Sequence, residues 1–265
     1  MRITSAHHCL IRWRHAPFLA LSVFLLTAQA DGLVATITTV KQSVVGVGTY
    51  QKTRSPAVIC FGTGFAVGDG THVMTNAHVI PPVLDPQRKE SLIVLVGHGD
   101  EYQQREAQVL SLDTDHDLAL LKITGEPVPT LKMGDSEKIR EGQSLAMTGY
   151  PLGLSLGLFP TTHRATLSAI VPIARATLNS RLLNPKMISR IREGAFAVFQ
   201  LDGTAYPGAS GSPLYDPDSG EVLGIVNMVF VKGTRETALT NPSGISYAIP
   251  SHFISELLSK TGIRN

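Results

Sequence analysis

The sequence predicts an all-β protein, folded as an antiparallel sandwich or barrel. Its apolar stretches are short, rich in β-branched residues and bounded by Gly, Pro, Asp or Asn, which is typical of strands joined by tight turns. The amphipathic helices of roughly ten to fifteen residues that alternate with strands in α/β folds are missing from the pattern. The predicted strands cover residues 43–50, 57–67, 72–76, 91–96, 117–123, 144–149, 165–171, 195–200, 221–231 and 245–249.

Residues 1–30 have the pattern of a secretory signal peptide. Three arginines and no acidic residue come first, the apolar run "APFLALSVFLL" follows, and the triplet "AQA" ends the segment. This order is typical of export with cleavage after residue 30. An uncleaved anchor is the alternative, but a membrane-spanning helix needs about twenty apolar residues. We therefore expect residues 31–265 to be the exported protein, without a stable membrane anchor.

The charge and the cysteines of the exported part exclude several classes of protein. The whole chain has 23 Lys and Arg against 21 Asp and Glu, and the signal segment holds three of the arginines. The remainder is close to neutral, so we expect no binding to nucleic acid. Cys60 is its single cysteine, which excludes an intramolecular disulfide. The apolar neighbours of Cys60 indicate a small core residue rather than a reactive thiol.

One helix is expected near the end of the sequence. Ser251 can cap its first turn, and Gly262 can end it. The apolar side chains that would share one face of this helix are Phe253, Ile254, Leu257 and Leu258.

A second, shorter helix is indicated at 184–193, inside the basic connection 172–195. This connection is interpreted either as a lid or partner-binding loop that orders the site, or as a solvated basic face. The residue pattern favours the solvated face.

Three stretches contain the groups that activate a hydroxyl nucleophile. A serine needs a base to take its proton, an acid to orient that base, and donors for the developing oxyanion. "TNAHVI" contains His78, "DTDHDLALLKI" contains Asp117, and "YPGASGSPLYD" contains Ser210. Asp113 and Asp115 lie close to Asp117, and periodicity does not choose among the three acids. The stretch around Ser210, taken alone, also fits a plain turn, because Gly and Ser are common turn residues.

These stretches, together with "GTGFAVGDGTHVMTNAHVI" and "GISYAIP", resemble the protease domain of the bacterial high-temperature-requirement (HtrA/Deg) serine proteases, within the chymotrypsin-like superfamily. The likeness extends from about Val34 to the terminal helix, and the order His, Asp, Ser is that of the chymotrypsin triad. The resemblance implies two six-stranded antiparallel β-barrels with a C-terminal helix, the first over 31–135 and the second over 136–265. It also implies hydrolysis of peptide bonds in a polypeptide substrate through an acyl-enzyme, without metal or cofactor.

Carried over position by position, the resemblance makes Ser210 the nucleophile and His78 the general base, then the general acid. Asp117 would fix the tautomer of His78 and stabilise its protonated form. Backbone N–H groups of Gly208 and Ser210 would form the oxyanion hole. Thr204 would lie at the base of the primary substrate pocket. The pocket walls would be formed by Ile225, Val226, Asn227 and Ile245.

The resemblance also has consequences for specificity and for the turn around Ser210. The lack of an acid at Thr204 argues against a Lys or Arg preference, and Ile245 should make the pocket shallow, which favours Val or Ala. Ala209 and Ser212 replace the Asn and the second Gly of the usual "GNSGGPL". Ala209 excludes the zymogen switch in which an Asp pairs with a new N-terminus. Ser212 would strain the turn if its φ were positive.

Two other functions are weighed against this one. An α/β-hydrolase-type esterase would use Ser210, Asp218 and His252, but position 212 is Ser where its G-x-S-x-G motif needs Gly. A protease-shaped binding or chaperone module would keep the triad unused. No histidine pair has metal-ligand spacing, and no helix follows the glycines of "GTGFAVG" as a dinucleotide fold requires.

Cellular location and physiological substrate follow from the family likeness alone. We expect a periplasmic protein, or else an extracellular one, that acts on unfolded or damaged proteins. Most relatives carry one or two PDZ domains after the protease domain, and we expect none here. The sequence leaves the oligomeric state open.

Overall fold

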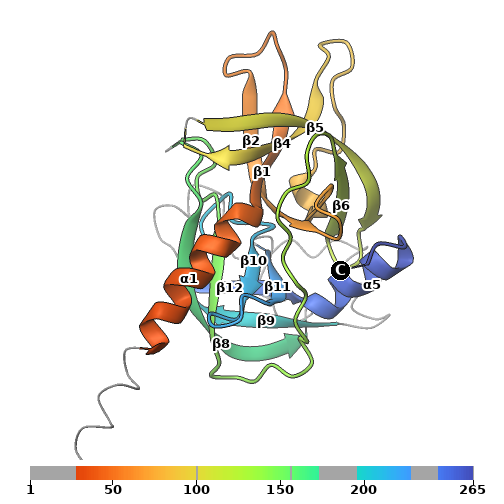
Figure 1. Cartoon of the computed structure of the whole chain (residues 1–265). Coiled ribbons are helices and arrows are strands. Elements are labelled where there is room, and N and C mark those ends of the chain that lie inside the picture. Colours follow the sequence, from red (N-terminus) through yellow and green to blue (C-terminus); the bar gives the residue numbers. More distant parts are fainter. Residues whose placement is uncertain (1–27, 100, 156, 173–195, 228–243, 265) are drawn as a thin grey trace, which may run out of the picture.

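The computed structural model describes residues 28–99, 101–155, 157–172, 196–227 and 244–264. Within these ranges, two closed antiparallel barrels of six strands each form the molecule, with the first barrel in the upper half of Figure 1. In spatial order, the first barrel consists of β1 (Val44–Tyr50), β2 (Val58–Val67), β3 (His72–Asn76), β6 (Leu118–Ile123), β5 (Glu101–Asp113) and β4 (Ser91–His98). The second consists of β10 (Pro213–Tyr215), β11 (Val222–Asn227), β12 (Ile245–Pro250), β9 (Ala197–Asp202), β8 (Thr161–Pro172) and β7 (Ser144–Gly149). The all-β prediction and the two-barrel architecture are confirmed.

Each predicted strand coincides with an observed one, but β5 and β10 were not predicted. β5 has the sequence "EYQQREAQVLSLD", and most of its side chains are exposed. It forms a strand because β4 and β6 pair with it on both sides, although it has no apolar run of its own. β10 has only three residues, all buried, which is too short for a periodic pattern. Residues 228–231 of the predicted strand 221–231 lie outside the described residues.

The terminal helix is confirmed as α5 (Ser251–Lys260), although Ser251 does not cap it. The Ser251 hydroxyl instead donates to the Gly134 carbonyl at 2.8 Å, which fastens the start of the helix to the segment between the barrels. The helix ends as expected at Gly262, whose φ is +74°. The N–H groups of Gly262 and Ile263 bond the last free carbonyls of the helix at 3.1 and 3.0 Å.

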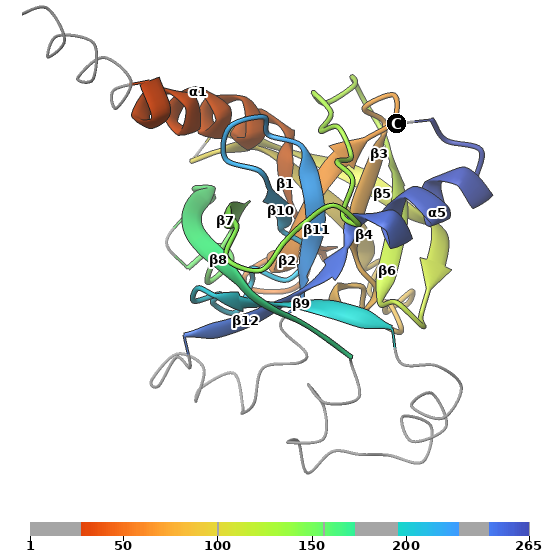
Figure 2. The same ribbon diagram turned by 90° about the horizontal axis from the view of Figure 1, so that it is seen from below.

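A helix before the first strand, α1 (Ala28–Ser43), was not predicted. Its β-branched sequence "VATITTV" has weak helix propensity, and buried contacts of Leu33 and Val40 compensate for it. The Thr36 hydroxyl donates to the Asp218 carbonyl at 3.2 Å, which joins α1 to the second barrel. Figures 1 and 2 show α1 and α5 on different sides of the molecule. The predicted helix 184–193 lies outside the described residues, as does the connection 172–195 beyond its first residue.

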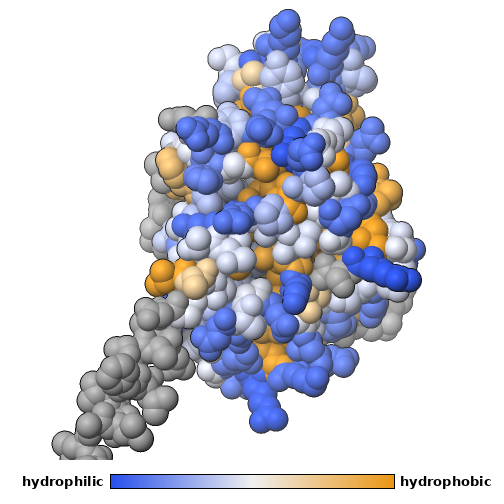
Figure 3. All heavy atoms as spheres, viewed as in Figure 1, coloured by the Kyte–Doolittle hydropathy of each residue, from blue (hydrophilic) through white to orange (hydrophobic). Residues whose placement is uncertain are grey.

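Three apolar clusters form the interior. Val47, Val73 and Val94 belong to the cluster inside the first barrel, and Leu145 and Leu201 to the cluster inside the second. The largest cluster draws side chains from both barrels and from α5, so it joins the barrels to each other. Hydrophilic side chains cover most of the outer face in Figure 3, with small hydrophobic patches between them.

Candidate active site

Ser210, His78 and Asp117 meet where the two barrels face each other. His78 lies in the short 3₁₀ helix η1 (Ala77–Val79) directly after β3, and Asp117 directly precedes β6. The C-terminal end of β3 pairs with the N-terminal end of β6, so both side chains leave the sheet at the same end. Ser210 lies in the turn before β10 and comes from the second barrel.

The three side chains form a continuous chain of hydrogen bonds. His78 Nδ1 lies 2.6 Å from Asp117 Oδ2, and His78 Nε2 lies 2.9 Å from Ser210 Oγ. When Nδ1 carries the proton that Asp117 accepts, the Nε2 lone pair faces the serine hydroxyl. Ser210 is 5 % exposed, while the His78 side chain is 31 % exposed. The arrangement allows His78 to accept the Ser210 proton at the edge of the solvent.

Asp117 has a backbone conformation that is unusual for a residue other than glycine. Its φ is +53°, in a region that costs of the order of 1–3 kcal/mol and that Asp tolerates better than most residues. The Asp117 carbonyl accepts hydrogen bonds from Asn76 Nδ2 and the Ala77 N–H, both at 3.1 Å. These bonds hold the backbone so that the carboxylate turns toward His78, whose own N–H donates to Oδ1 at 2.8 Å.

Asn227 contacts Asp117 from the opposite barrel. It is buried at the end of β11, and its Nδ2 donates to Asp117 Oδ2 at 2.6 Å. Asn227 was expected in the wall of the substrate pocket, whereas its side-chain amide faces the Asp117 carboxylate. Asp117 therefore accepts hydrogen bonds from both barrels.

Asp113, one of the two alternative acids, supports the turn rather than His78. Its Oδ2 lies 2.7 Å from His116 Nδ1, and its Oδ1 accepts the N–H groups of Asp115 and His116. Burial by itself raises the pKa of Asp113, but the hydrogen bonds from the His116 side chain and backbone lower it. The structure thus separates the acids that periodicity left equivalent.

The turn before Ser210 presents the Gly208 amide. The Ala209 N–H donates to the Tyr206 carbonyl at 2.9 Å, and the φ of Gly208 is +98°, which is the geometry of a type II turn with Pro207 in its second position. The Pro207 carbonyl accepts the Leu152 N–H at 2.6 Å. Because N–H and C=O point in opposite directions across a trans peptide, the Gly208 N–H points away from Leu152.

Glycine is required on both sides of the segment formed by Ala209 and Ser210. A Cβ at Gly208 would lie 2.4 Å from the Tyr150 carbonyl oxygen, and one at Gly211 would lie 1.9 Å from the Thr63 carbonyl oxygen. The Gly208 amide donates to no group in the part of the chain that the structure describes. A free, fixed amide at this position is what an oxyanion hole needs.

The two departures from the family pattern fit the fold without backbone strain. Ala209 is 8 % exposed and packs in the apolar cluster of the second barrel. The positive φ falls on Gly211, at +87°, and not on Ser212, so the strain considered for Ser212 does not arise. The Ser212 hydroxyl is buried, and it has no hydrogen-bond partner among the described residues.

The residues expected to form the substrate pocket are only partly brought together. Ile225 and Val226 are fully buried in β11, where their side chains pack in the core instead of facing a ligand. Ile245 is 43 % exposed at the start of β12, and Thr204 is partly exposed. The segment 228–243, which continues from β11, lies outside the described residues.

Ser246 holds the base of the expected pocket, and the sequence analysis missed it. Its hydroxyl donates to the Gly203 carbonyl at 2.5 Å and accepts the Ala205 N–H at 2.9 Å. It therefore bonds the residues on both sides of Thr204. The sequence offered no signal for this role, because alternation in "ISYAI" groups Ile245, Tyr247 and Ile249 on one face and leaves Ser246 on the other, whereas the structure buries Ser246.

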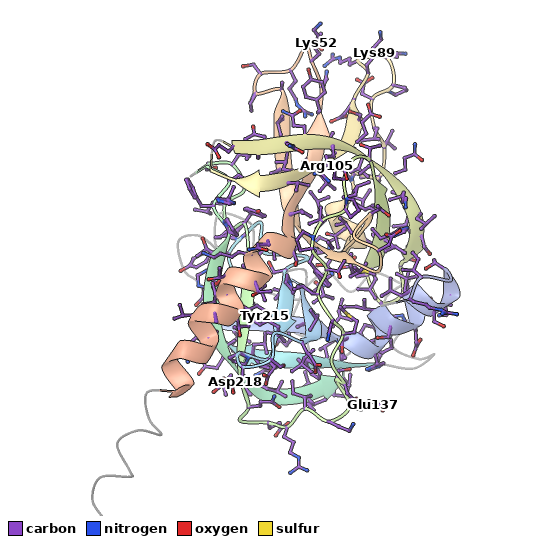
Figure 4. All side chains as sticks on the ribbon, viewed as in Figure 1. Lys52, Lys89, Arg105, Glu137, Tyr215 and Asp218 are labelled. Carbon is purple, nitrogen blue, oxygen red and sulfur yellow. The ribbon has the colours of Figure 1, made fainter. Side chains whose placement is uncertain are left out.

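The esterase alternative fails on the fold and on the surroundings of its residues. The structure has antiparallel barrels where an α/β hydrolase needs a parallel sheet. Asp218 lies beside α1 in Figure 4. His252 lies in α5, and its Nδ1 is 3.1 Å from Ser136 Oγ.

Two antiparallel barrels with an Asp–His–Ser chain at their junction are the architecture of chymotrypsin-like serine peptidases as a class. Comparison with known families supports this class, because the family described as "Trypsin-like peptidase domain" matches residues 62–225 of the chain. This is more than half of the chain. The chain belongs to the trypsin-like peptidase family.

Its relatives include HtrA-type proteases. It is 33 % identical over 189 residues to "Probable periplasmic serine endoprotease DegP-like" of Halomonas elongata, covering 71 % of this chain and 32 % of that protein. It is 33 % identical over 205 residues to "Serine protease HTRA2, mitochondrial" of Bos taurus, covering 77 % and 37 %. The chain thus spans about a third of the length of the curated relatives it matches.

A solved structure shares the fold. The "HtrA-type protease AlgW with decapeptide" superimposes with a TM-score of 0.63 at 21 % identity, covering 86 % of this chain and 67 % of that one. The chain therefore resembles an HtrA-type protease in the arrangement of its barrels as well as in its motifs.

Proposed function

We propose that this chain is an exported serine endopeptidase that hydrolyses peptide bonds with Ser210 as nucleophile. The observation that carries the proposal is the unbroken hydrogen-bond chain from Asp117 through His78 to Ser210 Oγ. An isolated serine hydroxyl is a weak nucleophile, and an adjacent oriented base is the usual way in which proteins activate it. The membership in a peptidase family supports the same reaction.

The roles of the residues follow from the geometry. His78 Nε2 takes the Ser210 proton as Oγ attacks the substrate carbonyl, and then returns it to the leaving amine. Asp117 keeps the His78 Nδ1–H oriented and stabilises the imidazolium that forms. The Gly208 and Ser210 amides receive the oxyanion. The acyl group on Ser210 is then released by water, which His78 activates in the same way.

Export, substrate and specificity belong to the same proposal. The signal pattern of residues 1–30 supports export, and relatives bear the name periplasmic, so we place the enzyme in the periplasm. No helix in the described ranges is long and apolar enough to cross a membrane. By analogy with the family, the substrates are unfolded or damaged proteins. Thr204 and Ile245 at the expected pocket support cleavage after small aliphatic residues such as Val or Ala.

The proposal is tested by labelling residues 31–265 with a fluorophosphonate and measuring the intact mass. One adduct is expected on the wild type at neutral pH. Ser210→Ala should give none, and His78→Ala and Asp117→Asn should react roughly 10³-fold or more slowly. The controls are Ser212→Ala, which keeps Ser210, and Asp113→Asn, which removes an acid that His78 does not contact. If the wild-type protein forms no adduct, the proposed hydrolysis is wrong, and the protease-shaped binding module becomes the favoured function.

A further inference from the structure

Thr63 of the first barrel contacts the turn that carries the proposed nucleophile. It lies in β2, is fully buried, and its Oγ1 donates to the Gly208 carbonyl at 2.8 Å. The same oxygen accepts the Tyr150 N–H at 3.0 Å. Its backbone N–H donates to the Ser210 carbonyl at 2.8 Å. One residue thus bonds both amino acids whose amides form the proposed oxyanion hole.

These contacts fix peptide planes on both sides of Gly208. The Leu152 N–H holds the plane before Gly208 through the Pro207 carbonyl, at 2.6 Å. The Thr63 hydroxyl holds the plane after it, through the Gly208 carbonyl. A glycine with positive φ has wide conformational freedom, so without the hydroxyl only the first of these planes keeps a bond from outside the turn.

Thr63 is itself held in place. Its carbonyl accepts the Thr75 hydroxyl of β3 at 2.6 Å, and Thr75 is fully buried. The Thr63 hydroxyl has a single proton and uses it on Gly208, while its lone pair receives Tyr150. The rotamer is therefore determined from two sides, as a group that positions a catalytic element requires.

We propose that the Thr63 hydroxyl is a positioning group for the oxyanion hole, reaching from the first barrel to set the orientation of the Gly208 and Ser210 amides. This inference rests on the proposed function for its effect on rate. Oxyanion donors act over a narrow range of distances, near 2.7–3.1 Å. The Gly208–Ala209 peptide, which the hydroxyl holds through its carbonyl, lies between the two peptides that carry the donor N–H groups. A small rotation of this middle peptide therefore displaces the donors on either side, and a misplacement of about 1 Å costs of the order of 10²-fold in rate.

The test compares Thr63→Val, which keeps the shape but removes the hydroxyl, with Thr63→Ser, which restores it. Thr148→Val is the matched control, because Thr148 is also buried and, among the described residues, its hydroxyl bonds only Tyr215 and Thr162, outside the catalytic turn. Two quantities are measured per folded molecule. These are the rate of fluorophosphonate labelling across pH and the hydrogen exchange of the amides in 206–211.

We expect Thr63→Val to be labelled about 10- to 100-fold more slowly at every pH. The pH of half-maximal rate should stay unchanged, since the His78 contacts are intact. Its turn amides should exchange faster than those of Thr148→Val, and Thr63→Ser should restore both quantities. If labelling and exchange in Thr63→Val match those in Thr148→Val, the inference is wrong.

Hydrogen exchange distinguishes a failure of the positioning role of Thr63 from a failure of the proposed peptidase function. If the wild type is not labelled at all, the proposed function fails, while faster exchange in Thr63→Val would still support the positioning role. If Thr63→Val does not fold, Thr63→Ser and Thr63→Ala are compared instead, and equal turn exchange in the two would overturn the inference.

Discussion

At the scale of single residues, the candidate site depends on side chains that reach from one barrel to the other. Thr63 contacts the turn of Ser210, and Asn227 contacts Asp117. Sequence motifs indicated His78, Asp117 and Ser210, because the residue types that the proposed reaction needs lie in recognisable motifs. Of the partners that hold them, Asn227 was assigned to the pocket wall and Thr63 to no role, because a buried polar side chain has no characteristic spacing in the sequence.

Asn227→Ala removes one of the three hydrogen-bond donors to the Asp117 carboxylate. A hydrogen bond to a charged group contributes about 1.5–3 kcal/mol, so the rate of fluorophosphonate labelling should fall roughly 10- to 100-fold. Ile225→Val is the control, since it removes a methylene from the same buried strand without touching Asp117. Equal labelling rates in the two variants would show that Asn227 is only a packing residue.

Ser212→Ala should make the protein more stable. The Ser212 hydroxyl is buried without a hydrogen bond from the described residues, and such a group costs about 1–3 kcal/mol. Its removal should raise Tm by roughly 2–4 °C or more. Ser251→Ala serves as the comparison, because the Ser251 hydroxyl is buried but satisfied by Gly134, and its loss should lower Tm. A lower Tm in Ser212→Ala would mean that the hydroxyl is satisfied in solution.

At the scale of elements, a partly buried polar cluster ties the turn between β1 and β2 to the start of β4. Glu90 Oε1 lies 2.7 Å from both Thr49 Oγ1 and Arg54 Nη1. The Thr49 hydroxyl and, after it, the Arg54 guanidinium lower the pKa of Glu90. Lys52, in the turn between β1 and β2, and Lys89, just before β4, extend into solvent at the same end of the barrel (Figure 4).

The lowered pKa of Glu90 makes the stability of this end of the barrel depend on pH. A carboxylate whose pKa is lower in the folded state stabilises the fold above its ordinary pKa, near 4.3. That stability is lost as the pH falls through the folded value. Glu90→Gln should therefore lower Tm by about 2–4 °C at pH 7, corresponding to about 1 kcal/mol after allowance for solvent screening.

The difference in Tm between the wild type and Glu90→Gln should shrink as the pH falls below about 4. Glu137→Gln is the control, since Glu137 is exposed and has no comparable set of partners. Thermal unfolding followed by circular dichroism between pH 3 and 7 measures both variants. A difference that stays constant over this range would contradict the role of the ionised carboxylate.

At the scale of the whole molecule, the fold was largely predictable from the sequence, and the pocket was not. Short apolar runs between turn residues indicated the strands, and the chemistry-bearing motifs indicated the class. β5 and α1 were missed because neighbouring strands and buried contacts, rather than local pattern, determine their structure. Ile225 and Val226 were placed in a pocket by position alone, and position does not reveal that both faces of β11 are buried.

The division of the proposed triad between two barrels also determines when activity can begin. His78 and Asp117 are made early, whereas β12, which lies between β11 and β9 in the second barrel, is made near the end. A chain still emerging from the ribosome therefore has the proposed nucleophile and the proposed base on separate, unfinished pieces. Under the proposed function, a copy gains activity only after its second barrel is complete, later than the stage at which its own unfolded chain is most open to cleavage.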